Sequence, residues 1–541
     1  MSEELSLPQL TRARREACFE RMTRECFDVL VVGGGITGAA VARHAACSGF
    51  SVALVEQGDF ASGTSSRSSR LIHGGLRYLK QGQVGLVYRS QRAQSELARL
   101  APHLAHPLDL LFPLYQKTFA SRFGHSCGML AYNALQPLDS KSRHARLSAE
   151  QLLEKEPLLA STELQGGFVC REYLTHDARL VLETLLAAER AGTVAINYAR
   201  VQELLLCGQR VVGASVSDAL TGRTVEIRAR VLVNATGPWA DGLMSRREGA
   251  NARLRLSKGV HIIIPRARLP LSHAVIFFSP RDKRALVAIP AENFVIVGPT
   301  ETEYFGAPGR VLPEREDVDY LLEALRAFFS ALDIERADLV AARAGLRPLY
   351  DKAGRAPGEV SRSYHIEWER EGLLSVLGGK LTLHRHAAQV TTSLLARELK
   401  MKGSRSARSQ MINQPLPGAL WKNASPAMTK NLLLEMGVEE ESAHHLLRTY
   451  GSRAALFHNI LAAEPELARR VTPALLHIAA EAPFSIRHEW AVTPQDFFER
   501  RTDLALSMKA TGASVPRELM RFWRAPAEKK LRAEKAEEVL V

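Results

Sequence analysis

Three glycines near the start of the chain have the spacing of a loop that holds a dinucleotide pyrophosphate. Gly33, Gly35 and Gly38 form a Gly-x-Gly-x-x-Gly pattern directly after the apolar run 27–32. The first glycine permits a tight turn, the second lets the backbone approach the phosphates, and the third allows a helix to pack closely on the strand. Glu56 ends the next apolar run, where a carboxylate can accept hydrogen bonds from ribose hydroxyls. The pattern therefore predicts a dinucleotide site.

The segments around these glycines have the composition of the elements that would position them. Residues 27–32 and 51–55 are typical of buried parallel strands, and the alanine-rich stretch 36–48 favours a helix whose N-terminus faces the phosphates. The hydroxyl-rich stretch 64–70 follows closely and suits a second phosphate clamp. A later apolar run enters Ala-Thr-Gly at 235–237, as in strands that return beneath a cofactor. Neither stretch distinguishes NAD from FAD.

The rest of the chain divides into a strand-rich and a helix-rich part. Short apolar runs between 260 and 297, punctuated by proline and glycine, predict a mostly antiparallel sheet separate from the first. Before them, Asp177 is expected to cap a helix. Strand patterns end near residue 405. Beyond it, Ser425, Thr472 and Thr493 each precede a proline, which predicts N-capped helices in a helical C-terminal domain.

Composition and charge limit the classes of partner. The chain has 541 residues and a formal net charge of +13, which suits nucleic acid, an acidic membrane surface or a phosphorylated substrate. We expect no nucleic-acid partner, because the sequence has no zinc module and no basic motif interleaved with aromatic residues. The six cysteines form no Cys-x-x-Cys pair, so we predict no disulfide framework and no metal site. No apolar run approaches the ~18 to 20 residues that cross a bilayer.

Several stretches resemble the FAD-dependent glycerol-3-phosphate dehydrogenase family, within the D-amino-acid-oxidase-like flavoproteins. The most specific is SSRLIHGGLRYL at 68–79, and the others follow in the family's order: DARLVL at 177–182, VNATGPW at 233–239, KGVHIIIP at 258–265, GLRPL at 345–349 and SVLGGKLT at 375–382. The helical tail resembles the family's C-terminal domain less specifically. The resemblance implies FAD as the cofactor, sn-glycerol 3-phosphate as the substrate, and hydride transfer from its C2 to flavin N5 to give dihydroxyacetone phosphate.

The implied fold is an α/β Rossmann-type FAD-binding domain that is discontinuous in sequence, a substrate-binding domain with a mixed or antiparallel sheet, and a helical C-terminal domain. We expect the FAD-binding domain at 27–95, 165–245 and 340–404, and the substrate-binding domain at 96–164 and 246–339. The helical domain would occupy 405–541, and a charged N-terminal extension 1–26.

Oxidation of an alcohol by a flavin requires a base for the hydroxyl proton, a C–H bond facing N5 and a firm hold on the phosphate. The resemblance assigns His73 to the base, which the near-neutral pKa of histidine suits; a hydrogen bond to a backbone carbonyl is the alternative. It assigns the phosphate to the forked guanidinium groups of Arg77 and Arg347, with a hydroxyl from Tyr78. Lys380 follows a glycine turn and would reach the substrate or the flavin, with a surface lysine as the alternative. The predicted catalytic residues are therefore His73, Arg347 and Lys380, and those that bind substrate are Arg77, Tyr78, Arg347 and Lys380.

The predicted FAD contacts combine the glycine loop, the hydroxyl-rich stretch and the later strand ends. They are Gly33, Gly35, Ile36, Thr37, Gly38, Glu56, Thr64, Ser65, Ser66, Ser69, Gly75, Val201, Gly237, Gly379, Leu381 and Thr382. His261 is a second candidate for the base, but it lies on an apolar strand, where a structural role is equally well founded.

Two stretches depart from the family pattern and keep other functions open. Residues 298–301 read GPTE where the family usually has GTTD, which removes a hydroxyl, and Leu383-His384 stands in place of Thr-Tyr. One alternative is a glycerol-3-phosphate oxidase that reduces oxygen, and another is a related oxidoreductase acting on a different anionic alcohol or amine. A flavin-binding regulator without turnover is disfavoured, because the predicted catalytic and phosphate-binding residues are all present.

The resemblance also implies electron transfer to a membrane quinone. The protein would be cytoplasmic and peripherally associated with the anionic inner face of the cytoplasmic membrane, and a homodimer is compatible with this arrangement. Two basic segments with apolar residues are candidates for a membrane-binding helix: 517–532, which contains Leu519, Met520, Phe522 and Trp523, and 118–132. The alternative for both is packing on the protein's own core.

Overall fold

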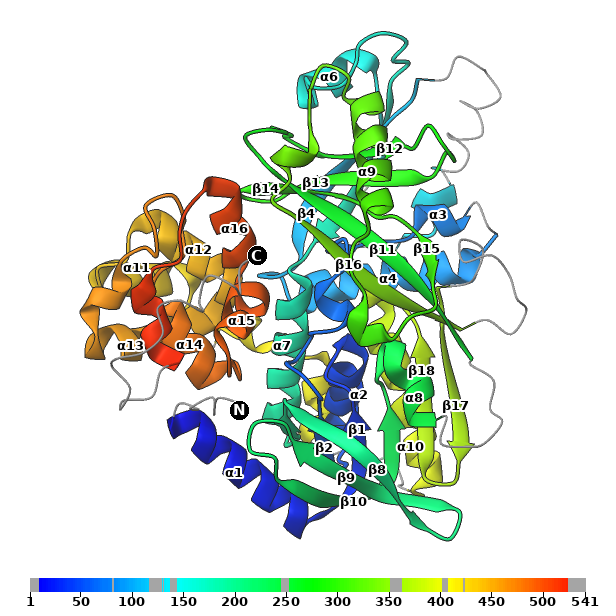
Figure 1. Cartoon of the computed structure of the whole chain (residues 1–541), viewed down its shortest axis with the longest axis vertical. Helices are drawn as coiled ribbons and strands as arrows, with labels where there is room; N and C mark the ends of the chain where they lie inside the picture. Colours follow the sequence, from blue (N-terminus) through cyan, green and yellow to red (C-terminus); the bar gives the residue numbers. More distant parts are fainter. Residues whose placement is uncertain are drawn as a thin grey trace.

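The structure is a computed structural model of the chain, and it describes residues 9–79, 82–115, 129, 131–136, 144–244, 253–350, 362–400, 407–421 and 424–523. One sheet lies in the lower half of Figure 1, a second sheet lies above it, and the C-terminal helices form a body on the left. The predicted fold class is confirmed: an α/β domain, a domain on a mixed sheet, and a helical C-terminal domain.

The first sheet is built around a parallel core. Its order is β17-β18-β10-β1-β2-β7, and the antiparallel pair β8–β9 attaches to β10. The strands are β1 (Cys26–Val32), β2 (Val52–Val55), β7 (Val194–Ile196), β8 (Ala199–Cys207), β9 (Arg210–Asp218), β10 (Thr224–Asn234), β17 (Tyr364–Arg370) and β18 (Leu373–Gly378). Because β7, β2, β1, β10 and β18 run parallel, their carboxyl ends meet at one edge of the sheet.

The second sheet has ten strands, most of them antiparallel. Its strands are β3 (Leu71–Ile72), β4 (His106–Pro113), β5 (Ala145–Leu147), β6 (Gly167–Leu174), β11 (Leu254–Pro265), β12 (Ala274–Phe278), β13 (Ala285–Pro290), β14 (Phe294–Gly298), β15 (Thr302–Tyr304) and β16 (Ala341–Tyr350). β3, β6 and β16 pair in this sheet although the sequence ranges assign them to the FAD-binding domain. The chain therefore passes between the sheets several times, and the domain boundaries stay a prediction.

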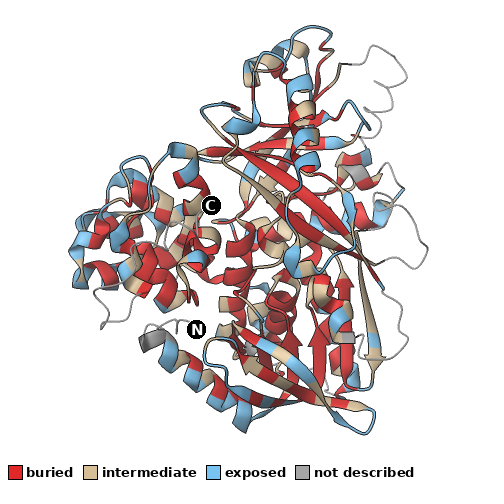
Figure 2. Cartoon of the chain, viewed as in Figure 1, coloured by how far each residue is buried: buried red, intermediate tan, exposed pale blue. Residues whose placement is uncertain are grey.

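Helices cover the sheets and account for their apolar strands. In the first two domains they are α1 (Gln9–Arg24), α2 (Ile36–Cys47), α3 (Leu76–Leu79), α4 (Val84–Leu100), α6 (Ala149–Lys155), α7 (Asp177–Arg190), α8 (Ala240–Met244), α9 (Arg315–Phe328) and α10 (His384–Glu398). The helices α2, α7 and α10 pack on one face of the first sheet, α1 packs near the other, and α9 packs on the second sheet. Burial on both faces explains why the central strands are continuous apolar runs, as the burial colours of Figure 2 show.

The N-terminus of α7 differs from the prediction. His176, rather than Asp177, caps the helix, since its Nδ1 accepts a hydrogen bond from Arg179 N at 3.3 Å. Asp177 instead accepts hydrogen bonds from Ser68 N at 3.1 Å and from Ser68 Oγ at 2.7 Å. The acid thus ties the hydroxyl-rich stretch to the helix.

Two of the three predicted helix starts in the C-terminal domain are confirmed. Its helices are α11 (Pro426–Glu435), α12 (Glu440–Tyr450), α13 (Phe457–Ala463), α14 (Glu481–His488), α15 (Pro494–Asp496) and α16 (Leu504–Thr511). Ser425 caps α11 and Thr493 caps α15. The prediction for Thr472 is wrong: Arg470 bridges to Ile478, and Val471 N donates to the carbonyl of His477, so the segment folds back on itself instead of forming a helix.

Buried ion pairs join the C-terminal helices to the first domain. Arg179 on α7 donates to both oxygens of Glu489, at 3.0 and 2.8 Å. Arg70 likewise contacts both oxygens of Asp503, each at 2.6 Å. Removing one partner of such a pair leaves an uncompensated buried charge and costs about 3–5 kcal/mol. We infer that the helical domain is firmly seated on the first domain.

The two predicted membrane-binding segments do not present a free apolar face in the part of the chain that the structure describes. Leu519 and Trp523 are buried in the C-terminal core, where Met520 and Phe522 also pack, so the described part of this segment packs on the protein's own core. Most of 118–132 and all of 524–532 lie outside the described residues. Across the described residues, no helix combines the length and the apolar character needed to cross a membrane.

Candidate active site

A cavity of about 370 Å³ opens at the edge where the carboxyl ends of the parallel strands meet. The loops after β1, β2, β10 and β18 all line it, which is the position expected for a dinucleotide in such a sheet. The predicted FAD contacts that line the cavity are Gly33, Gly35, Ile36, Thr37, Glu56, Thr64, Ser65, Val201, Gly237, Gly379 and Leu381.

The glycine loop packs too closely for any side chain. Gly33 has φ +110°, and a Cβ there would lie 2.5 Å from the carbonyl oxygen of Ala235. A Cβ on Gly38 would lie 1.8 Å from the carbonyl oxygen of Gly33. The third glycine therefore lets α2 start directly against the turn, and the first residues of α2 line the cavity, where the positive potential of the helix N-terminus favours a phosphate.

Two side chains fix the shape of this loop. Glu56 accepts hydrogen bonds from Gly34 N at 2.7 Å and from Gly58 N at 2.9 Å. Burial raises the pKa of Glu56. Ser65 Oγ accepts from Ile36 N at 3.0 Å, so the hydroxyl-rich stretch lies against the start of α2.

The other predicted FAD contacts lie next to the cavity or deeper in the protein. Gly38 packs on Gly33, and Ser69 Oγ lies 2.8 Å from His261 Nε2. Ser66 is buried. Thr382 is buried too, and its Oγ1 has no hydrogen-bond partner among the described residues.

His73, Gly75, Tyr78 and Lys380 come together beside the cavity. The centres of the His73 and Tyr78 rings are 6.2 Å apart, and Lys380 Nζ lies 4.7 Å from the centre of the Tyr78 ring. Gly75 has φ +89°, and a Cβ there would lie 2.4 Å from Tyr78 Cδ2 and 3.4 Å from Lys380 Nζ. The turn therefore requires glycine in order to bring the histidine loop onto the lysine.

Lys380 contributes a buried ammonium group to this site. Its Nζ is buried and has no hydrogen-bond partner among the described residues. Burial lowers the pKa of Lys380 to about 7; Glu172 opposes this shift and Arg362 adds to it. A buried cation without a partner favours an anionic ligand.

Glu172 on β6 is a residue of this site that the sequence did not reveal. Its carboxylate accepts hydrogen bonds from Gly74 N and Tyr132 OH, each at 3.1 Å, and from Gln94 Nε2 at 2.5 Å. Burial raises the pKa of Glu172 to about 7, which the hydrogen bond from Gly74 opposes. The acid thus holds the loop that carries His73 and stabilises the charge of Lys380.

Arg347 lies on β16, and the next residue, Pro348, lines the cavity. Its Nη1 donates to the carbonyl oxygen of Thr300 at 3.3 Å, and its guanidinium occupies the space above Gly259. Burial, with Arg347 and Arg343 nearby, lowers the pKa of His261 to about 3. Arg77 belongs to α3, but its side chain lies outside the described part of the structure.

Residues in both stretches that depart from the family pattern form hydrogen bonds or ion pairs in the structure. In the first, Glu301 stands in place of the family's aspartate and forms ion pairs with Arg284 and Arg362, while the unchanged Thr300 accepts a hydrogen bond at Oγ1 from Val260 N at 2.9 Å. His384 is buried, and its Nδ1 lies 2.6 Å from the carbonyl oxygen of Leu381. The changed residues therefore support the fold around the site.

Other residues that line the cavity were not predicted. They include Gln57, Ser62, Gly63, Arg200, Gln202, Glu203, Pro238, Trp239 and Pro348, whereas Ser68, which also lines the cavity, belongs to the predicted hydroxyl-rich clamp. Pro238 and Trp239 follow Gly237 in VNATGPW, so that stretch offered a signal for them. Of the β8 residues at the cavity only Val201 was predicted, and the place of Arg200, Gln202 and Glu203 depends on how β8 pairs with β9.

Comparison with known proteins identifies families and relatives that are similar to this chain. The family described as FAD dependent oxidoreductase matches residues 28–385, and the C-terminal domain of alpha-glycerophosphate oxidase matches residues 409–524. The aerobic glycerol-3-phosphate dehydrogenase of Bacillus subtilis is 37% identical over 502 residues, which is 91% of this chain and 90% of that protein.

Two solved structures with bound FAD are also similar to this chain. A glycerol-3-phosphate dehydrogenase from Bacillus halodurans, complexed with FAD, superposes with a TM-score of 0.75 at 31% identity, covering 95% of this chain and 96% of that one. L-alpha-glycerophosphate oxidase from Mycoplasma pneumoniae, with FAD bound, has a TM-score of 0.55 at 18% identity, covering 73% of this chain and 99% of that one. At this identity the oxidase shows a shared fold alone.

Proposed function

Since the chain belongs to the aerobic glycerol-3-phosphate dehydrogenases of the FAD-dependent oxidoreductase family, we propose that it oxidises the 2-hydroxyl of sn-glycerol 3-phosphate to the ketone of dihydroxyacetone phosphate. The observation that carries the substrate assignment is Lys380 Nζ, a buried amine at the cavity lining without a hydrogen-bond partner among the described residues. A phosphate dianion is the ligand that this amine favours in its protonated form.

The residues around the cavity fit FAD. The glycine loop leaves room for a pyrophosphate at the N-terminus of α2, and Glu56 stands where a ribose would lie. Thr382 Oγ1, buried without a partner among the described residues, has a hydroxyl available for the cofactor. When bound, FAD supplies the oxidising group, whose N5 accepts the hydride that leaves C2 of the substrate.

We assign substrate binding and proton transfer to side chains of this protein. Lys380, Arg347 and Arg77 hold the phosphate, and Tyr78 adds a hydroxyl donor. His73 accepts the proton of the 2-hydroxyl as the C2–O bond becomes a carbonyl. Glu172 positions the His73 loop through its hydrogen bond with Gly74 N.

We expect glycerol 3-phosphate to bleach the flavin absorbance under anaerobic conditions, whereas glycerol does not, because it lacks the phosphate. Arg347→Ala should weaken substrate binding by about 2 kcal/mol, roughly thirtyfold, through loss of a charge-assisted contact. His73→Ala should slow flavin reduction more than it weakens binding. Stopped-flow absorbance over a substrate series measures both, with the exposed Arg517→Ala as control. Unchanged reduction in both site variants would refute these assignments.

We further propose that electrons pass to a quinone at an anionic membrane. Phe305 and Leu312, on the loop between β15 and α9, are 89% and 71% exposed, and the exposed Arg310 lies between them in sequence. Large apolar side chains beside a basic residue suit the headgroup region of a bilayer, where a lipid-soluble quinone is dissolved.

Flotation with anionic vesicles tests this proposal. We expect the wild type to bind at low salt and to detach at high salt, and a Phe305→Ser, Leu312→Ser double variant to lose binding. Met428→Ser removes a 60% exposed side chain from α11 and serves as the control. Reduction of a quinone analogue should exceed peroxide production measured in parallel. Turnover that yields only peroxide, without vesicle binding, would identify an oxygen-reducing oxidase.

A further inference from the structure

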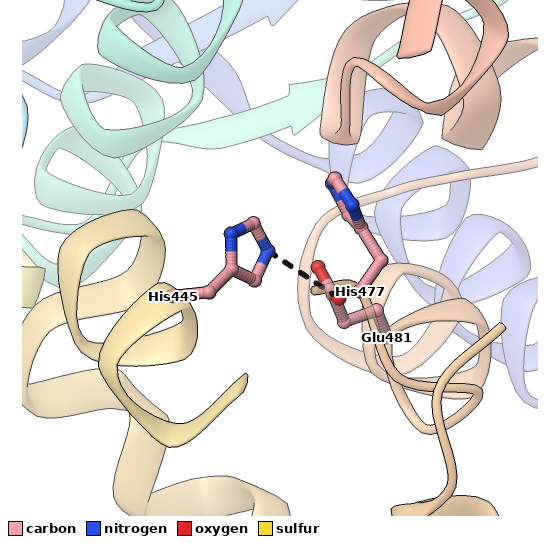
Figure 3. Close-up of side chains that lie close together, drawn as sticks. All are labelled: His445, His477 and Glu481. Carbon is pink, nitrogen blue, oxygen red and sulfur yellow. Dashed lines mark ion pairs between the residues drawn. The ribbon is translucent and has the colours of Figure 1, made fainter. Parts of the chain in front are cut away.

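Three potential metal ligands meet inside the C-terminal domain, away from the cavity already described. They are His445 on α12, His477 in the loop before α14, and Glu481 at the start of α14. One ligand atom from each lies within 4.8 Å of the others. Figure 3 shows His445 directed toward the Glu481 carboxylate, with the His477 ring beside them.

Each histidine has one ring nitrogen without a hydrogen bond among the described residues, and His445 Nε2 forms an ion pair with Glu481. Within the described residues, His445 Nε2 and His477 Nδ1 are buried and have no hydrogen-bond partner. His445 Nε2 lies 3.6 Å from Glu481 Oε1, which is too long for a hydrogen bond. A buried polar atom without a hydrogen bond destabilises the fold, so two of them beside one carboxylate favour a ligand that binds both.

The carboxylate is already oriented by neighbouring groups. Tyr450 OH donates to Glu481 Oε2 at 2.8 Å, and Ile478 N donates to Glu481 Oε1 at 3.0 Å. Hydrogen bonds from such outer groups are what hold metal-binding carboxylates in place, and each oxygen keeps a lone pair for a cation.

We propose that His445, His477 and Glu481 bind one zinc ion. Two imidazoles and one carboxylate form a recognised zinc ligand set, in which a water completes the tetrahedron. Zinc bonds of about 2.0–2.1 Å place ligand atoms about 3.4 Å apart, so side-chain rotations of about 1 Å would close the site. The ion would tie α12, the 470–478 turn and α14 together, a structural role independent of the flavin chemistry.

Metal analysis of the full-length, FAD-loaded protein tests the proposal, after removal of any affinity tag and without chelator. We expect about one zinc per chain, and less than about one tenth of that in His445→Gln and in His477→Gln. His444→Gln is the matched control, because His444 is adjacent in sequence but its side chain is 59% exposed. Chelation should lower the thermal unfolding midpoint of the wild type and of the control, and leave the ligand variants unchanged.

A second measurement keeps the test decisive if the ligand variants fail to fold. Cobalt added to the chelated wild type should produce tetrahedral visible bands with an end point of one ion per chain, and zinc should displace them. Wild type that takes up neither zinc nor cobalt would overturn the proposal. Equal metal content in the wild type and in folded ligand variants would overturn it as well.

Discussion

Gly38→Ala should yield a protein that is nearly colourless, whereas the wild type should be yellow with one non-covalently held FAD per chain. The added Cβ would lie 1.8 Å from the carbonyl oxygen of Gly33. That oxygen belongs to the backbone, so α2 and the glycine turn must separate, and the amides at the helix start move away from the pyrophosphate. We expect flavin content below about one tenth of the wild-type value, measured by absorbance after acid release.

Gly85→Ala is the control for this substitution. Gly85 lies on α4, and a Cβ there would meet nothing closer than Arg89 Nη1 at 3.6 Å. Replacing glycine by alanine at this exposed helical position should also stabilise the protein slightly. Circular dichroism separates loss of FAD from loss of the fold. A folded Gly38→Ala protein that keeps a full complement of FAD would show that the close contact is not required.

The dinucleotide site could be predicted from the sequence because its determinants are local. Gly33, Gly38 and Glu56 belong to one strand–helix–strand unit, and their spacing sets the geometry. The Lys380 turn could be predicted only through the family resemblance. The Nζ atom of Lys380 is buried without a hydrogen-bond partner among the described residues because β18, which precedes this turn, pairs with β10 inside the sheet.

Glu172 could not be predicted because its environment is assembled from distant segments. Pairing of β6 with β3 and β4, together with the packing of α4, brings Gly74, Gln94 and Tyr132 to one carboxylate. No spacing in the sequence connects these positions. The same is true of His445, which lies on a different helix from Glu481.

The basic segment near Trp523 shows why a sequence pattern alone does not distinguish a membrane-binding helix from a segment that packs on the core. Its alternation of arginine with apolar residues is typical of a membrane-surface helix, yet the same pattern serves a segment that packs on a core. Leu519 and Trp523 face the C-terminal core, and Arg521 contacts Glu464 at 2.8 Å. Periodicity alone does not say which apolar surface a segment covers.

Lys380→Met should lower kcat/KM for glycerol 3-phosphate on the order of a hundredfold near pH 6.5 and should remove an alkaline limb from its pH profile. The pKa of Lys380 is lowered to about 7 by burial, so the side chain is cationic below this pH and neutral above it. Wild-type kcat/KM should therefore fall roughly tenfold per pH unit above about 7 and approach the kcat/KM of the Lys380→Met variant at high pH. Steady-state kinetics with a dye acceptor between pH 6.5 and 9 measures the limb.

Three companion variants separate charge from structure in this prediction. Lys380→Arg keeps a cation at every pH measured and should flatten the limb, and exposed Lys509→Met should leave it unchanged. Glu172→Gln removes the anion that raises the pKa of Lys380, so the limb should move to lower pH. Because the two groups interact, the wild-type midpoint belongs to the pair. A purely structural role for Glu172 would lower the unfolding temperature without moving this midpoint, and an unaltered limb in Lys380→Met would assign the titration to another group.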